Sequence, residues 1–172
     1  REAAMTLMDQ GADVLAFNSA STAVMAAAEE RGQLAIAYHS DMRGVAPQAQ
    51  LVAVTHHWEN YDIARVRALR AGTWIAGTRG LRAGTWKSQD TWGGVKDGMV
   101  RIEAFGPKVP AAVQKEVLAR QQDIAAGRLV PFAGPVVDHT GRVRVPRGRG
   151  ASDAEILQMN YLVEGVQGSL PK

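Results

Sequence analysis

The segment spanning residues 11–58 contains three short runs of apolar and β-forming residues, each followed by small polar, imidazole or indole side chains. The runs cover residues 14–18, 34–38 and 51–55, and an alanine-rich helical stretch at 22–31 separates the first two. A strand, a crossover helix and a second strand form a β-α-β unit, which makes the two strands parallel. In an open α/β sheet, ligands bind beyond the carboxyl ends of the strands. The sequence therefore predicts an α/β fold that receives a small molecule at one edge of a parallel sheet.

The residues that follow the three runs are the candidates for binding that molecule. They are Asn18, Ser19 and Ser21 after the first run, Asp41 after the second, and His56 and Trp58 after the third.

The loop at residues 18–22 lies where a strand turns into a helix. Exposed N–H groups at a helix start favour anions or polar ligand oxygens, so Asn18, Ser19 and Ser21 are suited to ligand contacts. Ser21 can equally cap the helix, which Gly32 would close. Both roles stay open, because one hydroxyl can cap while another faces the ligand.

Asp41 belongs to a Ser-Asp pair directly after the second run. A carboxylate in this place can accept two hydrogen bonds from vicinal sugar hydroxyls or from ring N–H groups of a base. It can also be a turn aspartate that bonds its own backbone. The spacing favours neither interpretation.

Adjacent imidazole and indole side chains, His56, His57 and Trp58, follow the third run. An indole stacks on a flat heterocycle, and a neutral imidazole donates or accepts a hydrogen bond. Alternatively, Trp58 is a core aromatic residue and the histidines only end a strand. Neighbouring strand residues point to opposite faces, so the two histidines are not expected to share a metal ion, and no metal site is predicted.

The composition excludes several classes of function. The 172 residues include 46% hydrophobic and 22% charged residues, which suits one good core or two small lobes. The absence of cysteine excludes disulfides, cysteine nucleophiles and thiolate metal sites. The net charge of +3 is only mildly basic, and RVRVPRGRG at 142–150 favours a solvated hairpin edge over a phosphate site, so no nucleic-acid partner is expected.

The chain also lacks the motifs of common catalytic and cofactor sites. GxGxxG, GxxxxGK[ST] and GxSxG are all absent, which removes the main support for dinucleotide, P-loop and activated-serine chemistry. Asp138 and His139 are expected to lie in a hairpin turn. No catalytic residue and no cofactor are predicted.

Further elements are expected along the rest of the chain. They are helices at 2–10, 61–70, 110–126 and 152–163, a strand at 98–105, and a hairpin of 135–138 with 142–145. Ser152 and Glu155 have the spacing of a capping box. The hexamer LRAGTW occurs at 69–74 and again at 81–86, which indicates a small tandem duplication inserted in a surface loop over 69–86.

Eight segments in order carry a resemblance to a known family. They are GADVLAFNSAS, AAEERG, YHSDMRGVAP, THHWENY, AGTW, WGGVKDGMV, RLVPFAGPVVDHTGRV and MNYLVEGVQGSLP. Across essentially all 172 residues, the chain resembles the C-terminal part of the basic membrane protein (Bmp) family, the purine nucleoside receptor-type substrate-binding proteins of ABC importers.

The resemblance implies a type I periplasmic-binding fold, in which two α/β lobes close on a ligand by a hinge. It implies no enzyme activity, a purine nucleoside or related base as ligand, and a membrane permease as partner. It also implies export to the periplasm, or anchoring as a lipoprotein outside the inner membrane. The chain starts at Arg1 in what reads as mid-helix, so we expect it to hold one lobe plus segments returning toward an absent first lobe.

The family's binding residues can be carried over at two places. Asp41 matches the ligand-binding aspartate of the Ser-Asp motif, and residues 18–22 match a ligand-facing strand end. Nucleoside-binding members have a lysine fifteen positions past that aspartate, where this chain has His56. This departure favours a different or smaller ligand, such as a free purine base or another flat heterocycle.

Two other functions stay open on the sequence. One is a nucleoside-processing enzyme in which Asp41 and His56 are acid–base partners. The other is a cytoplasmic ligand-sensing domain of a transcription regulator built on the same two-lobe fold.

Overall fold

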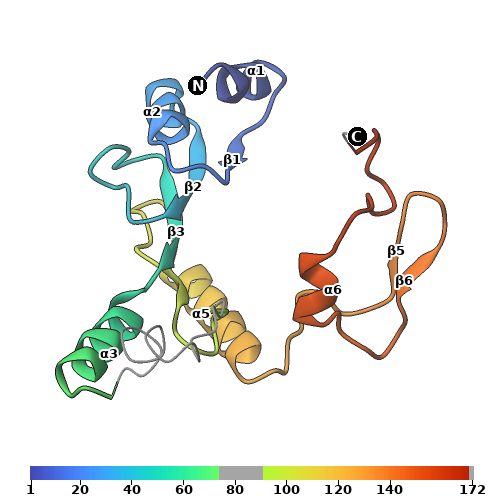
Figure 1. Cartoon of the computed structure of the whole chain (residues 1–172). Helices are drawn as coiled ribbons and strands as arrows, with labels where there is room; N and C mark the ends of the chain where they lie inside the picture. Colours follow the sequence, from blue (N-terminus) through green and yellow to red (C-terminus); the bar gives the residue numbers. More distant parts are fainter. Residues whose placement is uncertain (74–90, 171–172) are drawn as a thin grey trace. The chain divides into compact units, whose positions relative to one another are not determined.

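The computed structural model describes residues 1–73 and 91–170 and divides the chain into two compact units, Arg1–Ala125 and Ala126–Lys172 (Figure 1). The predicted duplication over 69–86 lies outside the described residues from residue 74 onward.

The first unit is built on a four-stranded sheet with the order β1-β2-β3-β4. The strands are β1 (Val14–Ala16), β2 (Leu34–His39), β3 (Gln50–His56) and β4 (Val100–Glu103). The helices of this unit are α1 (Glu2–Asp9), α2 (Ala23–Arg31), α3 (Glu59–Arg70) and α5 (Ala111–Ala125). β1, β2 and β3 are parallel, as predicted.

The sheet departs from the prediction in two ways. β4 runs antiparallel to β3, with Val100 opposite His56, and the His57 N–H donates to the Met99 carbonyl over 2.8 Å just before β4 begins. The predicted parallel sheet is therefore a mixed one. β1 is also shorter than the predicted run at 14–18: it ends at Ala16, and it lies at the sheet edge, where Val14 is 41% exposed.

Helix α2 begins one residue later than predicted. The Ser21 Oγ accepts the Ala23 N–H over 3.2 Å, while Thr22 occupies the N-cap position without a side-chain cap bond. Gly32 ends the helix in the left-handed region at a φ of 66°, which costs a glycine nothing because it has no Cβ.

The core between helices α1 and α2 and the sheet consists mainly of alanine and methionine. Ala35, Ala37 and Ala53 are fully buried and point to the same side as α2, whose Met25 and Ala27 are also at 0% exposure. Small side chains on both surfaces let the helix approach the strands closely. The alternation of buried alanines in β2 is the period of two that a strand requires.

The other face of the sheet is covered by apolar residues that follow β4. Ile36 and Val52 line a cavity of about 190 Å³ together with Phe105 and with Val113 and Val117 of α5. Val113 and Val117 are four residues apart and therefore lie on one face of this helix. Val113 is nevertheless 45% exposed, so α5 covers this face of the sheet only in part.

The second unit contains a hairpin and a short helix. Its elements are β5 (Val136–Val137), β6 (Val143–Val145) and α6 (Asp153–Leu157). The predicted capping box is confirmed, since Ser152 accepts the Glu155 N–H and the Glu155 side chain accepts the Ser152 N–H. The helix ends at Leu157 rather than at residue 163.

Asp138 is the turn residue that the sequence predicts. It is 1% exposed, and its Oδ1 accepts the Thr140 N–H and the Arg142 N–H while its Oδ2 accepts Arg144 Nε over 2.7 Å. The Thr140 hydroxyl is a further donor to this carboxylate and contributes most to lowering its pKa. Together the donors hold the pKa of Asp138 far below its usual range. The hairpin turn therefore forms around a buried carboxylate.

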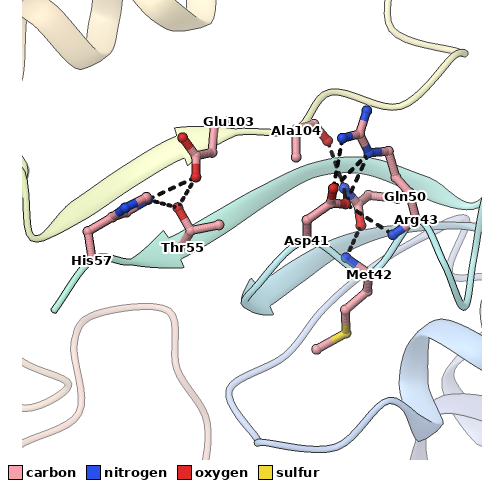
Figure 2. A network of polar contacts seen from close by, with 8 residues as sticks. All are labelled: Asp41, Met42, Arg43, Gln50, Thr55, His57, Glu103 and Ala104. Atoms are coloured by element: carbon pink, nitrogen blue, oxygen red, sulfur yellow. Dashed lines mark hydrogen bonds and ion pairs between the residues drawn. The ribbon is translucent and has the colours of Figure 1, made fainter. Parts of the chain in front are cut away.

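Gln50 fixes the loop that joins β2 to β3. Its side chain is fully buried: Nε2 donates to Asp41 Oδ1 over 3.0 Å and to the Ala104 carbonyl over 2.7 Å, and Oε1 accepts the Met42 N–H over 2.9 Å (Figure 2). At the other end of the loop, Glu29 of α2 accepts the Ala49 N–H over 2.7 Å. The loop is thus tied to both the sheet and the helix.

We expect Gln50→Leu to destabilise the protein that carries this chain by at least about 2 kcal/mol, because the Met42 N–H and the Ala104 carbonyl lose their partner. Urea unfolding of the wild type and the variant measures the loss. The control is Gln122→Leu on an exposed position of α5, expected to stay within about 0.5 kcal/mol. Equal stability of both variants would contradict the role given to Gln50.

Candidate functional site

The carboxyl ends of β1, β2 and β3 meet at one edge of the sheet, because the three strands are parallel. Asn18 and Ser19 follow β1 as exposed residues, and among the described residues neither side chain makes a hydrogen bond. His39 ends β2 and His56 ends β3. The structure therefore places most of the sequence-predicted residues along one edge.

His39 and His56 bring the ends of β2 and β3 into direct contact. Their Nδ1 atoms face each other, and their ring centroids are 4.7 Å apart. The Tyr38 ring packs edge-on to His56 at 5.4 Å. Burial, followed by the nearby His39 and His57, lowers the pKa of His56. Its imidazole is therefore neutral at neutral pH, with one donor and one acceptor nitrogen.

A cavity of about 220 Å³ lies at the end of β3. The residues that line it are His56, Trp58, Thr91, Trp92, Gly93, Met99 and Val100. Trp58 is 46% exposed and contacts Tyr61 edge-on at 5.9 Å, so it is not the core aromatic residue of the alternative interpretation. The cavity offers a flat molecule indole surfaces and the neutral imidazole of His56.

Asp41 lies apart from this cavity. Its carboxylate contacts the side chain of Gln50, which begins β3, whereas His56 ends that strand. Arg43 donates to both carboxylate oxygens at 2.7–3.0 Å, and chiefly for this reason the pKa of Asp41 is lowered to about 2. The Arg43 N–H also donates to Oδ1, which is the backbone bond of a turn aspartate. The described geometry does not pair Asp41 with His56 as acid and base.

His57 points to the other face of the sheet from His56, as predicted. Its Nε2 lies 2.8 Å from Glu103 Oε1, and its Nδ1 lies 2.9 Å from Glu59 Oε1 (the Glu103 contact is drawn in Figure 2). Thr55 donates its hydroxyl to the same Glu103 oxygen over 2.8 Å. Glu59, followed by Glu103, raises the pKa of His57. His57 thus links the last residue of β4 to the first residue of α3.

The described residues contain no candidate metal site. Within residues 1–73 and 91–170, no group of three or more histidine, cysteine, aspartate and glutamate side chains could hold a metal ion.

Thr91, Trp92 and Met99 line the cavity but are not among the sequence-predicted binding residues. The signal available was WGGVKDGMV at 92–100, in which an indole precedes two glycines. Its position next to His56 follows from the antiparallel return of β4, and the sequence gives no sign of that direction.

Comparison with known proteins gives the family of the chain. Residues 1–131 match the family described as ABC transporter substrate-binding protein PnrA-like, or Bmp. The chain belongs to this family. Members are substrate-binding components of transporters rather than enzymes, in agreement with the prediction, and the α/β periplasmic-binding-like fold is confirmed as a mostly parallel mixed sheet flanked by helices.

Two curated proteins are similar to this Bmp-family chain over nearly its whole length. A purine-binding protein of Brucella abortus is 36% identical over 171 residues, which is 99% of this chain and 45% of that protein. A putative ABC transporter glucose-binding protein of Haloferax volcanii is 28% identical over 172 residues, covering 99% and 38%. The Bmp-family chain spans less than half the length of these relatives.

One solved structure, of a transcriptional activator of the comK gene from Bacillus halodurans, has a TM-score of 0.59 at 17% identity, covering 76% of this Bmp-family chain and 42% of that one. This likeness concerns the fold alone. No helix among the described residues is long and apolar enough to cross a membrane.

We expect the contribution of His57 to stability to depend on pH. Its folded-state pKa is raised above 6.5, so the contribution is fully present below that value and is lost as the pH rises through the folded pKa. The free energy of unfolding of the wild type should therefore exceed that of His57→Gln by more at about pH 6 than at about pH 8.

Urea unfolding at both pH values measures this difference. The control is Gln122→Leu on an exposed position of α5, which removes no titratable group and should show no such change. An equal advantage of the wild type at both pH values would mean that Glu59 and Glu103 do not hold the proton on His57.

Proposed function

We propose that this chain is part of the solute-binding component of an ABC importer, and that its ligand is a purine base, a purine nucleoside or a similar flat heterocycle. The observation that carries the proposal is that His56 and Trp58 line one cavity at the carboxyl end of β3. In parallel α/β sheets this is the place where ligands bind.

The chemistry of the cavity suits a heterocycle. An exposed indole provides a stacking surface, and the neutral His56, whose Nδ1 faces His39, keeps Nε2 to donate to or accept from the edge of a base. Asn18, Ser19 and Ser21 add hydroxyl and amide groups along the same edge. Ligand sites of this kind combine a mostly apolar lining with a few convergent polar groups.

Asp41 is proposed to contribute once ligand is present. Its carboxylate is ionised at neutral pH and 41% exposed, so it can exchange Arg43 for ligand hydroxyl or N–H donors. This exchange would require movement of the loop that Gln50 anchors.

The remaining parts of the proposal concern the whole protein. Its partner would be a membrane permease, and its location would be the periplasm or the outer side of the inner membrane, with or without a lipid anchor. A second lobe would close over the ligand by a hinge and stabilise the closed state through its contacts with the ligand. The similarity to a purine-binding protein supports a purine over other solutes.

A thermal-shift screen of the protein that carries this chain tests the ligand class. We expect adenine, guanine or their ribonucleosides to raise the melting temperature by several degrees, because a ligand that binds only the folded state stabilises it. Glucose is included because one relative is named for it. A shift with glucose and none with any purine would contradict the purine assignment.

We expect Trp58→Ala to weaken purine binding by roughly 1–3 kcal/mol, the range for stacking of a base on an aromatic side chain. Isothermal titration calorimetry measures the loss. Val66→Ala serves as the control, because Val66 is 56% exposed in the same unit and lines none of the described cavities. Unchanged affinity in Trp58→Ala would remove Trp58 from the site.

A further inference from the structure

Trp92 provides the cavity at the end of β3 with a second indole. We propose that Trp92 and Trp58 together form the walls against which a planar ring binds, and that this cavity takes the ring of the ligand but not an attached sugar. This inference rests on the proposed function, because it concerns the same site.

The exposure of Trp92 is the first argument. Its side chain is 59% exposed, more than Trp58 at 46%, although both line the same cavity. Single exposed apolar residues are common on protein surfaces and need no explanation. Here two indoles line the same cavity beside a neutral imidazole. Their exposed ring surface is available for stacking, because the described part of the chain does not cover it.

The size of the cavity is the second argument. Its volume of about 220 Å³ is below the ~300–1,000 Å³ of sites that enclose drug-sized ligands. The share of the site that this chain forms therefore suits a one- or two-ring heterocycle better than a ring with a sugar attached.

The lining is the third argument. Apart from the two indoles, each with one N–H donor, only His56 and Thr91 among its seven residues have polar side chains, and none is a carboxylate, an amide, a lysine or an arginine. Sugar hydroxyls in protein sites are usually met by carboxylates and amides, which donate or accept in pairs. A purine edge needs fewer partners: His56, whose Nδ1 faces His39, has Nε2 as a donor or an acceptor, and the Thr91 hydroxyl can do either.

Gly93 leaves space for the Met99 side chain in the lining of the cavity. A Cβ on this residue would lie 2.2 Å from the Met99 sulfur, so any larger residue would displace the Met99 side chain, which lines the same cavity. The displaced thioether is flexible and can fill the space that the ring would occupy. Gly93→Ala therefore gives a test that leaves both indoles in place.

The experiment measures the dissociation constants of adenine and adenosine by titration calorimetry, using the protein that carries this chain. Trp92→Ala should weaken binding of both by roughly 5- to 150-fold, as loss of a base–aromatic stack does, and by the same factor for each. Trp92→Phe keeps a ring and should stay within a few-fold of the wild type. Val66→Ala is the control for loss of an exposed apolar side chain.

A second pair of variants tests the cavity without removing an indole. Gly93→Ala should weaken binding of adenine, and Gly93→Ala combined with Met99→Ala should restore it, because the shortened side chain leaves the space open again. These two variants test whether the ring binds in this cavity even if Trp92→Ala lowers the melting temperature of the unliganded protein.

The outcomes separate this inference from the proposed function. If the wild type binds neither purine bases nor nucleosides, the purine assignment of the proposed function fails. If the wild type binds and Trp58→Ala is weakened while Trp92→Ala and Gly93→Ala bind normally, only the present inference is overturned. Adenosine binding far more tightly than adenine would overturn the part that leaves the sugar outside this cavity.

Discussion

The parallel pairing of β2 with β3 is the constraint on which the rest of the first unit depends. It places His39 next to Thr55 and brings the ends of both strands to one edge, where the His39 and His56 rings meet. It also requires the chain to return from the end of β2 to the start of β3. That return is held at both ends, by Glu29 of α2 and by the buried Gln50 amide. The parallel pairing of β2 with β3 therefore accounts both for the edge that can receive a ligand and for the loop that carries Asp41.

The pleat of β3 separates two kinds of chemistry at its end. His56 faces the cavity, and burial keeps it neutral, so its Nε2 can serve as a donor or an acceptor toward a heterocycle while Nδ1 faces His39. His57 faces the opposite side, where two carboxylates favour its protonated form. Adjacent residues with the same side chain therefore have opposite pKa shifts, because strand neighbours point to opposite faces. One belongs to the binding edge, and the other fixes the position of α3 against β4.

Close packing of small side chains explains how a short chain builds this frame. The core of the first unit has few large residues, and its buried alanines let α2 lie close to the strands. The opposite face of the sheet is covered by α5 only in part. In the second unit, a single buried carboxylate, Asp138, organises the hairpin turn through backbone donors and Arg144.

The sequence by itself determined the elements with strong local signals: the three parallel strands, the alanine-rich helix, the turn at Asp138 and the capping box at Ser152. It also placed His56 and Trp58 at a strand end, because the carboxyl ends of parallel strands share an edge. Tertiary structure decided what depends on contacts between distant residues. The return of β4 against β3 brought Trp92 and Met99 to that edge, and the Gln50 and Arg43 side chains drew Asp41 away from it. Local sequence patterns indicate which face of a strand or helix a residue occupies. The direction of a returning strand and the partner of a carboxylate depend instead on packing across the sheet.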